Sequence, residues 1–324
     1  MCYQVSIRTY IFEAYYLNYR DMSTKDIVRI KSVSQLCQLF DYEKPTPPLI
    51  TVVDASKWAI REEFIGQRFT SDLYFIALKD KSCGLQYGRH HYDFDEGVLV
   101  FAAPIQTAYI TNEQDRDDVN GWMVFFHPDL IRNTNLGASI DSYHFFSYDV
   151  HEALHLSEPE QKTITDCSDH IRQEISGRID NHSHRVIVSN LELLLNYCQR
   201  FYERQFNTRT AQNKDIISVV NALLKEYYNM DQFAKAGLPS ISYFADKVHL
   251  SPHYLSDLLK KETGQSAKEY INEFIVDKAK TLLLGTTASV SEIAYSLGFS
   301  YPHYFSRLFR IKTGMTPKEY REVS

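Results

Sequence analysis

The chain has 324 residues, of which 44% are hydrophobic and 23% charged, and it carries 35 Lys and Arg against 41 Asp and Glu. This composition is typical of a globular protein of about two domains and excludes a disordered, collagen-like or rod-like coiled-coil protein. No segment reaches the roughly 18 apolar residues of a membrane helix, and the first residues do not form a signal-peptide core. We therefore expect a cytoplasmic protein that has no membrane partner.

The charge is divided unevenly along the chain. From Lys214 onward there are 14 Lys and Arg against 12 Asp and Glu, whereas the first 213 residues hold 21 against 29. This division permits a DNA-binding C-terminal part, but an ordinary solvated surface would show the same numbers.

The cysteines are odd in number and none is spaced as CxxC, which predicts reduced and mostly buried thiols, with neither a disulfide framework nor a zinc knuckle. They are Cys2, Cys37, Cys83, Cys167 and Cys198.

Residues 1–21 show no periodic apolar face. Met22 then opens a polar, well-capped segment whose apolar residues, from Ile27 to Phe40, follow a helical spacing. We interpret residues 1–21 as an extension outside the core and Met22 as the functional start; a short ordered arm is the alternative.

From about Lys44 the sequence changes to short runs of aromatic and β-branched residues separated by turn residues, which predicts an antiparallel sandwich or barrel. The Asp95–Gly97 turn predicts a hairpin, and its second strand must end before Pro104.

Helical periodicity begins beyond Ser157, which forms a predicted capping box with Glu160 for a helix to about Ser176 that ends at Gly177. A second helix is expected from Arg185 to about Gln205. Its apolar stripe either packs within the protein or forms a dimer seam, and we favour packing. The stripe contains Val188, Leu191, Leu194, Leu195, Cys198 and Tyr202. Residues 207–214 lack apolar periodicity and are interpreted as an interdomain linker.

An internal repeat is the most informative feature of the sequence. The segment PHYLSDLLKKETGQSAKEY (252–270) returns 50 residues later as PHYFSRLFRIKTGMTPKEY (302–320), with 10 identities in 19 positions. Each copy follows a short amphipathic helix and a brief break, which is the plan of a helix-turn-helix unit. Gly298 in the second turn and His249 in the first suit positive φ, and the second helices are expected to open on Ser251 and Ser300.

Each of these second helices has one apolar and one polar face. The expected packing faces are Tyr254, Leu255, Leu258 and Leu259 in the first copy, and Tyr304, Phe305, Leu308 and Phe309 in the second. The outward faces are His253, Ser256, Asp257 and Lys260, and His303, Ser306, Arg307 and Arg310. The outward side chains can reach base edges or phosphates of DNA.

A linking helix, about Ala267–Leu284, has apolar residues on several sides and can pack against both units. At 1.5 Å per residue it is roughly 25 Å long, enough to hold two recognition helices about one DNA turn apart.

These motifs, YLSDLLKKETG and SLGF followed by HYFSRLFR, resemble the C-terminal domain of AraC-type transcription regulators over about 100 residues. The resemblance implies an all-α double helix-turn-helix domain in which the first turn of each recognition helix contacts DNA. Those positions are Pro252, His253, Ser256, Asp257, Pro302, His303, Ser306 and Arg307. Asp257 stands where a basic or amide residue is frequent in the family, and Ile275 where many members carry Arg. Both changes weaken electrostatic binding of the first helix-turn-helix unit to DNA, so we expect the second to anchor the protein on DNA. The N-terminal part more weakly resembles a cupin-type sensor domain.

Three further patterns in the sequence could carry metal or redox chemistry, but their context disfavours each. His151 to His155 matches the HExxH zinc pattern, but it follows a strand-like segment and is cut off by the Ser157 cap. His90 and His91 are adjacent and would point to opposite faces of a strand. Cys83 and Cys198 lack a basic cluster or visible partner for redox sensing. We therefore predict no catalytic residue, no metal and no cofactor.

The sequence thus predicts a multidomain transcription regulator. We expect an extension over residues 1–21, a cupin-like β-barrel sensor or dimerisation domain with flanking helices over 22–206, a linker over 207–214 and the DNA-binding domain over 215–324. The expected partners are double-stranded DNA and a second copy in a homodimer, while a small-molecule effector and RNA polymerase stay open. A ligand-independent regulator, or a cupin-like metal enzyme with an accessory DNA module, are the alternatives.

Overall fold

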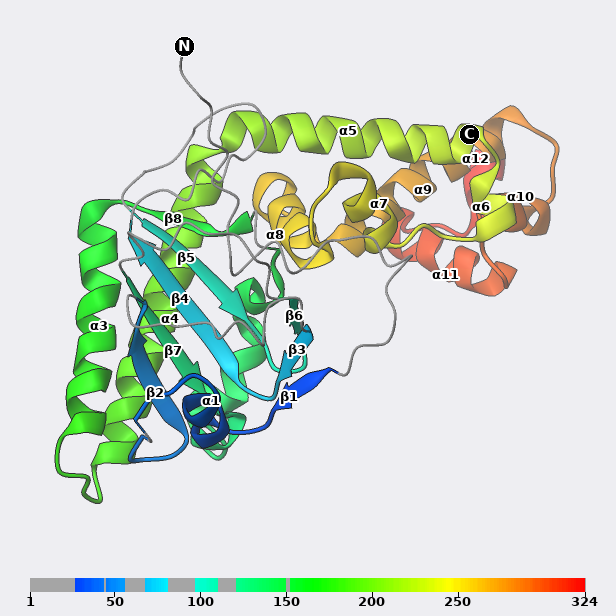
Figure 1. Cartoon of the computed structure of the whole chain (residues 1–324). Coiled ribbons are helices and arrows are strands. Elements are labelled where there is room, and N and C mark those ends of the chain that lie inside the picture. Colours follow the sequence, from blue (N-terminus) through cyan, green and yellow to red (C-terminus); the bar gives the residue numbers. More distant parts are fainter. Residues whose placement is uncertain are drawn as a thin grey trace, which may run out of the picture. The chain divides into compact units, whose positions relative to one another are not determined.

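The computed structural model divides the chain into two compact units, residues 1–208 and 209–324 (Figure 1). It describes residues 27–43, 45–55, 68–80, 97–109, 121–149 and 152–323. The division falls inside the segment expected to be a linker, whose residues are nevertheless helical on both sides of Arg209. Several positions singled out above lie outside the described residues: 1–21, Cys83, His90, His91, Asp95 and His151.

The N-terminal unit contains two sheets. A five-stranded antiparallel sheet has the order β2-β7-β4-β5-β8, and a three-stranded sheet has the order β1-β3-β6, with β1 parallel to β3. The strands are β1 (Val28–Ile30), β2 (Ile50–Asp54), β3 (Arg68–Ser71), β4 (Tyr74–Asp80), β5 (Gly97–Ala102), β6 (Thr107–Tyr109), β7 (Gly121–Phe126) and β8 (Leu154–Leu156). As expected from Pro104, β5 ends at Ala102.

The expected barrel is not found as a closed barrel. Within the described residues, β2 and β8 are the two edges of an open sheet. The sequence could not show this, because closure depends on pairing between strands far apart in the chain, whereas the runs of aromatic and β-branched residues report only burial.

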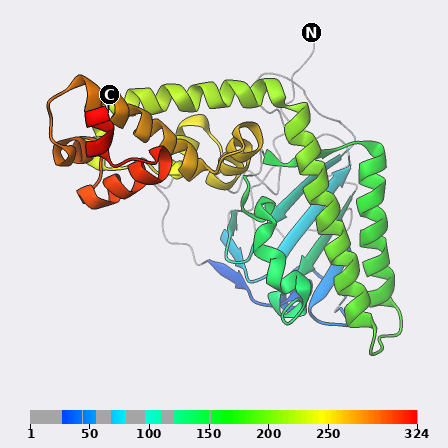
Figure 2. The same ribbon diagram turned by 180° about the vertical axis from the view of Figure 1, so that it is seen from behind.

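Both faces of the five-stranded sheet are covered. One face, which includes Val53, Ala77 and Met123, packs against α1 (Val33–Leu39) and the small sheet. The residues between them, such as Ile76 and Val124, point to the opposite face because strand side chains alternate. Figure 2 shows α3 (Glu158–Ser176) and α4 (Ser183–Thr208) side by side over that opposite face.

The helix expected from the spacing of Ile27 to Phe40 is shorter than predicted. Val28 to Ile30 form strand β1, which pairs with β3, and the helix starts only at Val33. Ser32 caps this helix, because its Oγ accepts a hydrogen bond from the Gln35 amide at 3.1 Å. The spacing of Ile27 and Ile30 fitted a helix, but sheet pairing with β3 decided the local structure.

The helices after Ser157 agree with the sequence. The capping box of Ser157 and Glu160 is present, α3 ends at Ser176, and Gly177 follows it with an ordinary negative φ. The stripe of α4 is buried within the unit against α3 and the sheet, which confirms packing for those residues. Short elements complete the unit: α2 (Asn135–Ser139) and three 3-10 turns at Pro128–Leu130, Ile140–Ser142 and His144–Ser147.

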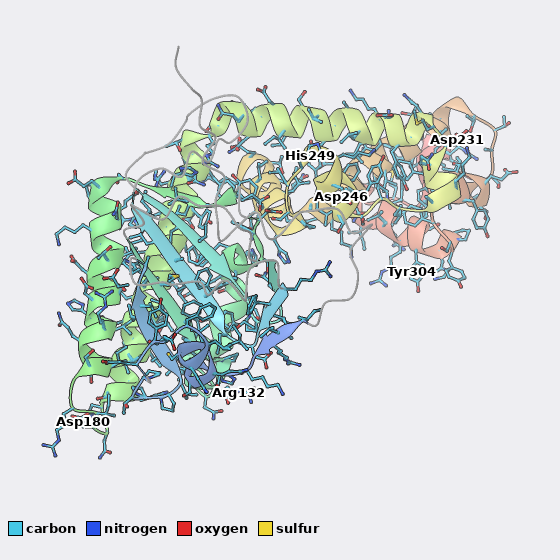
Figure 3. All side chains as sticks on the ribbon, viewed as in Figure 1. Arg132, Asp180, Asp231, Asp246, His249 and Tyr304 are labelled. Carbon is cyan, nitrogen blue, oxygen red and sulfur yellow. The ribbon has the colours of Figure 1, made fainter. Side chains whose placement is uncertain are left out.

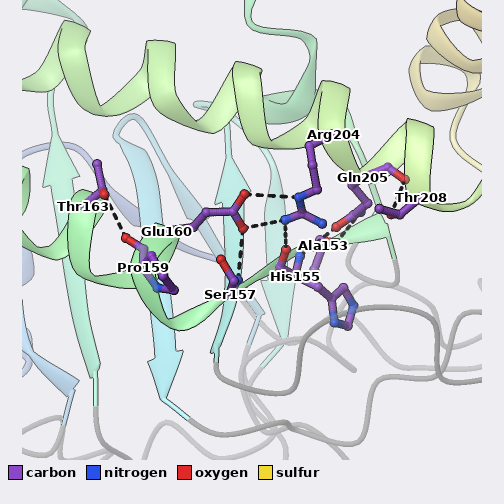
Figure 4. Close-up of polar contacts among 9 residues, drawn as sticks. All are labelled: Ala153, His155, Ser157, Pro159, Glu160, Thr163, Arg204, Gln205 and Thr208. Atoms are coloured by element: carbon purple, nitrogen blue, oxygen red, sulfur yellow. Dashed lines mark hydrogen bonds and ion pairs between the residues drawn. The ribbon is translucent and has the colours of Figure 1, made fainter.

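The outer edge of β8 bonds to side chains of α4 (Figure 4). Gln205 accepts from the His155 amide at 2.8 Å and donates to the Ala153 carbonyl at 3.1 Å. Arg204 donates to the His155 carbonyl at 2.6 Å and to both oxygens of Glu160. His155 therefore lies on a strand and not on the helix that the HExxH zinc pattern requires.

The C-terminal unit is all-helical in its described residues. Its helices are α5 (Thr210–Asn229), α6 (Gln232–Ala236), α7 (Ile241–Val248), α8 (Pro252–Thr263), α9 (Ala267–Gly285), α10 (Val290–Ser296), α11 (Pro302–Thr313) and α12 (Pro317–Val323). In the part of the chain that the structure describes, no helix is both long and apolar enough to span a membrane.

Candidate nucleic-acid interface

The C-terminal unit contains two helix-turn-helix units, the first formed by α7 with α8 and the second by α10 with α11. His249 (φ 56°) and Gly298 (φ 83°) occupy the turns in the left-handed region, as predicted. Ser251 caps α8 by accepting from the Tyr254 amide at 3.2 Å. The predicted cap at Ser300 is wrong by one residue, because α11 begins after Tyr301, which makes no side-chain capping bond.

On α8, the expected packing residues are all buried, and the expected outward residues are exposed or half-buried. His253 and Lys260 are exposed, while Pro252, Ser256 and Asp257 are half-buried. The Ser256 hydroxyl donates to the Pro252 carbonyl at 2.7 Å, so this side chain is held against its own helix.

On α11, the outward face is more strongly charged. Arg307 and Arg310 are exposed one turn apart, beside exposed His303 and half-buried Pro302 and Ser306. The helix also carries Lys312 and has no acidic residue, whereas in α8 Asp257 and Glu262 offset two lysines. The positive charge available to a DNA phosphate is therefore concentrated in the second unit.

Tyr304 is the main departure from the expected pattern. It was predicted to pack like its repeat counterpart Tyr254, which is fully buried, but 55% of Tyr304 is exposed. In the first unit α5 packs against both α7 and α8, while α11 contacts α9, α10 and α12. The repeat identity could not reveal this, because α5 lies outside the repeated segment. Tyr301 is also exposed and was not predicted as a surface residue.

Helix α9 contacts both helix-turn-helix units, as predicted. Ile271, Ala279 and Leu283 are buried along it, and its 19 residues make it roughly 28 Å long. Ile275, where the resembling family often carries Arg, is 0% exposed and belongs to the core. It therefore offers no charge to a ligand.

Four carboxylates near helix starts are held ionised by capping bonds. The Ser266 hydroxyl and amide lower the pKa of Glu269. Bonds from Ser289 and Thr316 likewise lower the pKa values of Glu292 and Glu319, and the charge of Arg310 adds to the effect on Glu319. In the N-terminal unit, bonds from the His182 and Ser183 amides lower the pKa of Asp180, which Figure 3 labels at the start of α4.

The residues described here contain no group of three or more His, Cys, Asp or Glu side chains that could hold a metal. Cys37, Cys167 and Cys198 are free and buried. Burial raises the pKa of all three thiols, most strongly that of Cys198.

Comparison with protein families matches residues 244–322 to a helix-turn-helix domain. The C-terminal unit belongs to the AraC-type helix-turn-helix family. The match spans both units of this AraC-type domain, from α7 to α12.

Curated proteins similar to the chain are transcriptional regulators. YfiF of Bacillus subtilis, an HTH-type regulator, is 33% identical over 119 residues, which cover 36% of this chain and 34% of YfiF. The activator RhaS of Escherichia fergusonii is 28% identical over 254 residues, covering 69% of this chain and 84% of RhaS. The chain spans only about a third of the length of YfiF and of YijO from Escherichia coli.

Solved structures similar to the AraC-type domain include the C-terminal domain of the response regulator yesN from Fusobacterium nucleatum, at 33% identity and a TM-score of 0.29. This match covers 33% of this chain and 98% of that chain. The DNA-binding domain of AdpA, in complex with a target DNA, is 22% identical with a TM-score of 0.29. It covers 33% of this chain and 90% of that chain.

Proposed function

We propose that this protein is a sequence-specific transcription regulator whose residues 215–324 bind double-stranded DNA. The observation that carries the proposal is the outward face of α11, on which Arg307 and Arg310 are exposed one turn apart in a helix without acidic residues. In a helix-turn-helix unit this helix enters the major groove, and its first residues contact base edges.

The proposed contacts divide between bases and phosphates. Arg307 can donate two hydrogen bonds to O6 and N7 of a guanine, and Arg310 can neutralise a phosphate. The other proposed contact residues are Pro252, His253, Ser256, Asp257, Lys260, Pro302, His303 and Ser306. Because α8 has no net charge and α11 has three basic residues, the second helix-turn-helix unit anchors the protein on DNA.

We further propose that residues 22–206 form a cupin-like domain that either senses a small molecule or mediates dimerisation, with control by a small molecule as the favoured role. The similarity to RhaS supports regulation by the whole chain, since it covers 69% of this chain and RhaS is an activator. An activator acts through RNA polymerase, so RNA polymerase is a proposed partner. A second copy of the protein, in a homodimer, is another, and the proposed location is the cytoplasm.

One observation favours a ligand-independent regulator as the second candidate. In the described part of the N-terminal unit, the face of the five-stranded sheet that lies against α1 is filled by Met123, Phe125 and their neighbours. These side chains occupy the space that a ligand on that face would need. Thermal-shift screening separates the two candidates, because a ligand at 100 times its dissociation constant stabilises the protein by about 2.7 kcal/mol.

The DNA-binding proposal is tested by selection. The full-length protein is incubated with random-sequence duplexes, the bound duplexes are amplified over several rounds, and the enriched sequences are determined. We expect a shared motif that the protein binds at least about 1,000-fold more tightly than a scrambled duplex. Recovery of unrelated sequences with equal affinity would contradict sequence-specific binding.

A further inference from the structure

A cluster of three aromatic rings opens the second recognition helix. Tyr301 is 59% exposed and Tyr304 55% exposed, and His303 lies at the surface between them in the sequence. The ring centroids are 4.1 Å apart for His303 and Tyr304, 6.0 Å for Tyr301 and Tyr304, and 5.7 Å for Tyr301 and His303. Figure 3 shows Tyr304 projecting away from α11.

The contacts with two other rings restrict the orientation of the Tyr304 phenol. A tyrosine has few rotatable bonds, so a ring already held by its neighbours loses little conformational freedom when it binds a partner. Single exposed tyrosines are ordinary on protein surfaces, but three rings in mutual contact at the start of a recognition helix form an ordered aromatic surface.

The positive charge of α11 favours DNA as the partner of these rings. The ring cluster lies at the N-terminal end of the helix that carries Arg307, Arg310 and Lys312 and no acidic residue. A positively charged helix with aromatic rings at its first turn complements the major groove of DNA, where phosphates flank the base edges. The apolar group exposed on those edges is the C5-methyl of thymine.

We infer that Tyr304 is a specificity-determining residue of the second unit, and that its ring contacts a thymine methyl group in the major groove. This inference rests on the proposed DNA-binding function. It also gives the two units different modes of recognition, because the matching Tyr254 is fully buried and cannot contact a base.

The test replaces thymine by uracil, which removes only the methyl group. Each thymine of the duplex enriched by selection is replaced in turn, and the affinity of the full-length protein is measured for every replacement. We expect one replacement to weaken wild-type binding by about fourfold, the equivalent of one buried methyl group, and to change binding of Tyr304→Ala by less than about 1.5-fold.

Two variants sharpen the comparison. Tyr304→Phe keeps the ring and should keep the dependence on the methyl group. Tyr295→Ala removes a tyrosine of α10 that is 54% exposed and lies outside the recognition helix, and it should behave as wild type. Circular dichroism confirms that each variant is folded.

The inference is overturned if Tyr304→Ala shows the same response to every uracil replacement as wild type, which would point to a protein partner for the rings. That result would leave the enriched motif intact, whereas failure of the proposed function would yield no motif at all.

Discussion

Gly298 lies where the turn of the second helix-turn-helix unit meets the loop after α6. Its φ is +83°, and a Cβ atom added there would lie 2.7 Å from the Phe233 carbonyl oxygen and 2.9 Å from the Gly237 carbonyl carbon. Both neighbours are backbone atoms that cannot rotate away. A side chain at this position therefore meets two obstacles, the left-handed conformation and the overlap.

We predict that Gly298→Ala lowers the free energy of unfolding by roughly 3 kcal/mol. Gly264→Ala is the matched control, because Gly264 has φ +74° but no atom within 4 Å of an added Cβ. The control should lose only about 1 kcal/mol, the cost of the backbone conformation. Urea denaturation followed by circular dichroism measures both, and equal losses would show that the contact with the α6 loop is unimportant.

The buried thiols provide a second prediction at this scale. Burial raises the pKa values of Cys37, Cys167 and Cys198, so the reactive thiolate forms even less readily than in an exposed cysteine. Alkylation at about pH 8 should leave these three cysteines unmodified in the native protein and modify them after unfolding. Peptide mapping by mass spectrometry reports each site, and fast native labelling of Cys198 would contradict its burial.

At the scale of elements, local signals predicted the two helix-turn-helix pairs and the linking helix α9 well, but α5 and α6 were not predicted. The capping residue Ser251, the turn residues His249 and Gly298 and the buried face of α8 are all determined within a few residues of sequence. The open sheet and the exposure of Tyr304 were missed because both depend on distant elements, the pairing of edge strands in one case and the position of α5 in the other.

The capping boxes of α9, α10 and α12 predict sensitivity to acid. The pKa values of Glu269, Glu292 and Glu319 are lower than the ordinary value of 4.5 in the folded state. A lowered folded pKa contributes stability that is present above the ordinary pKa and is lost as the pH falls through the folded pKa. The C-terminal unit should therefore lose stability below about pH 4.5.

A variant with Gln at all three positions tests this cause. Glutamine also fits a capping box but does not titrate, so the variant should stay close to wild type at neutral pH and depend less on pH in acid. Thermal unfolding at about pH 6 and about pH 3.5 measures the difference. Parallel losses in the two proteins would assign the acid sensitivity to other groups.

At the scale of the whole molecule, the N-terminal and C-terminal units differ in how much the sequence could predict about their roles. The repeat and the basic face of α11 identified a DNA-binding module and its candidate residues. For the N-terminal unit, the sequence predicted strands followed by helices, but a binding site needs side chains from several strands brought together. No spacing within one segment encodes that arrangement, so the effector could not be derived.

We propose that the second helix-turn-helix unit anchors the protein on a specific DNA sequence through Arg307. The most direct test is a titration of wild type, Arg307→Ala and Arg310→Ala against the enriched duplex and a scrambled duplex at two salt concentrations. Arg307→Ala should lose roughly 1–3 kcal/mol on the enriched duplex and much less on the scrambled one. Arg310→Ala should weaken binding to both alike and reduce the salt dependence by about one unit. Wild-type affinity of Arg307→Ala for the enriched duplex would contradict this role of Arg307.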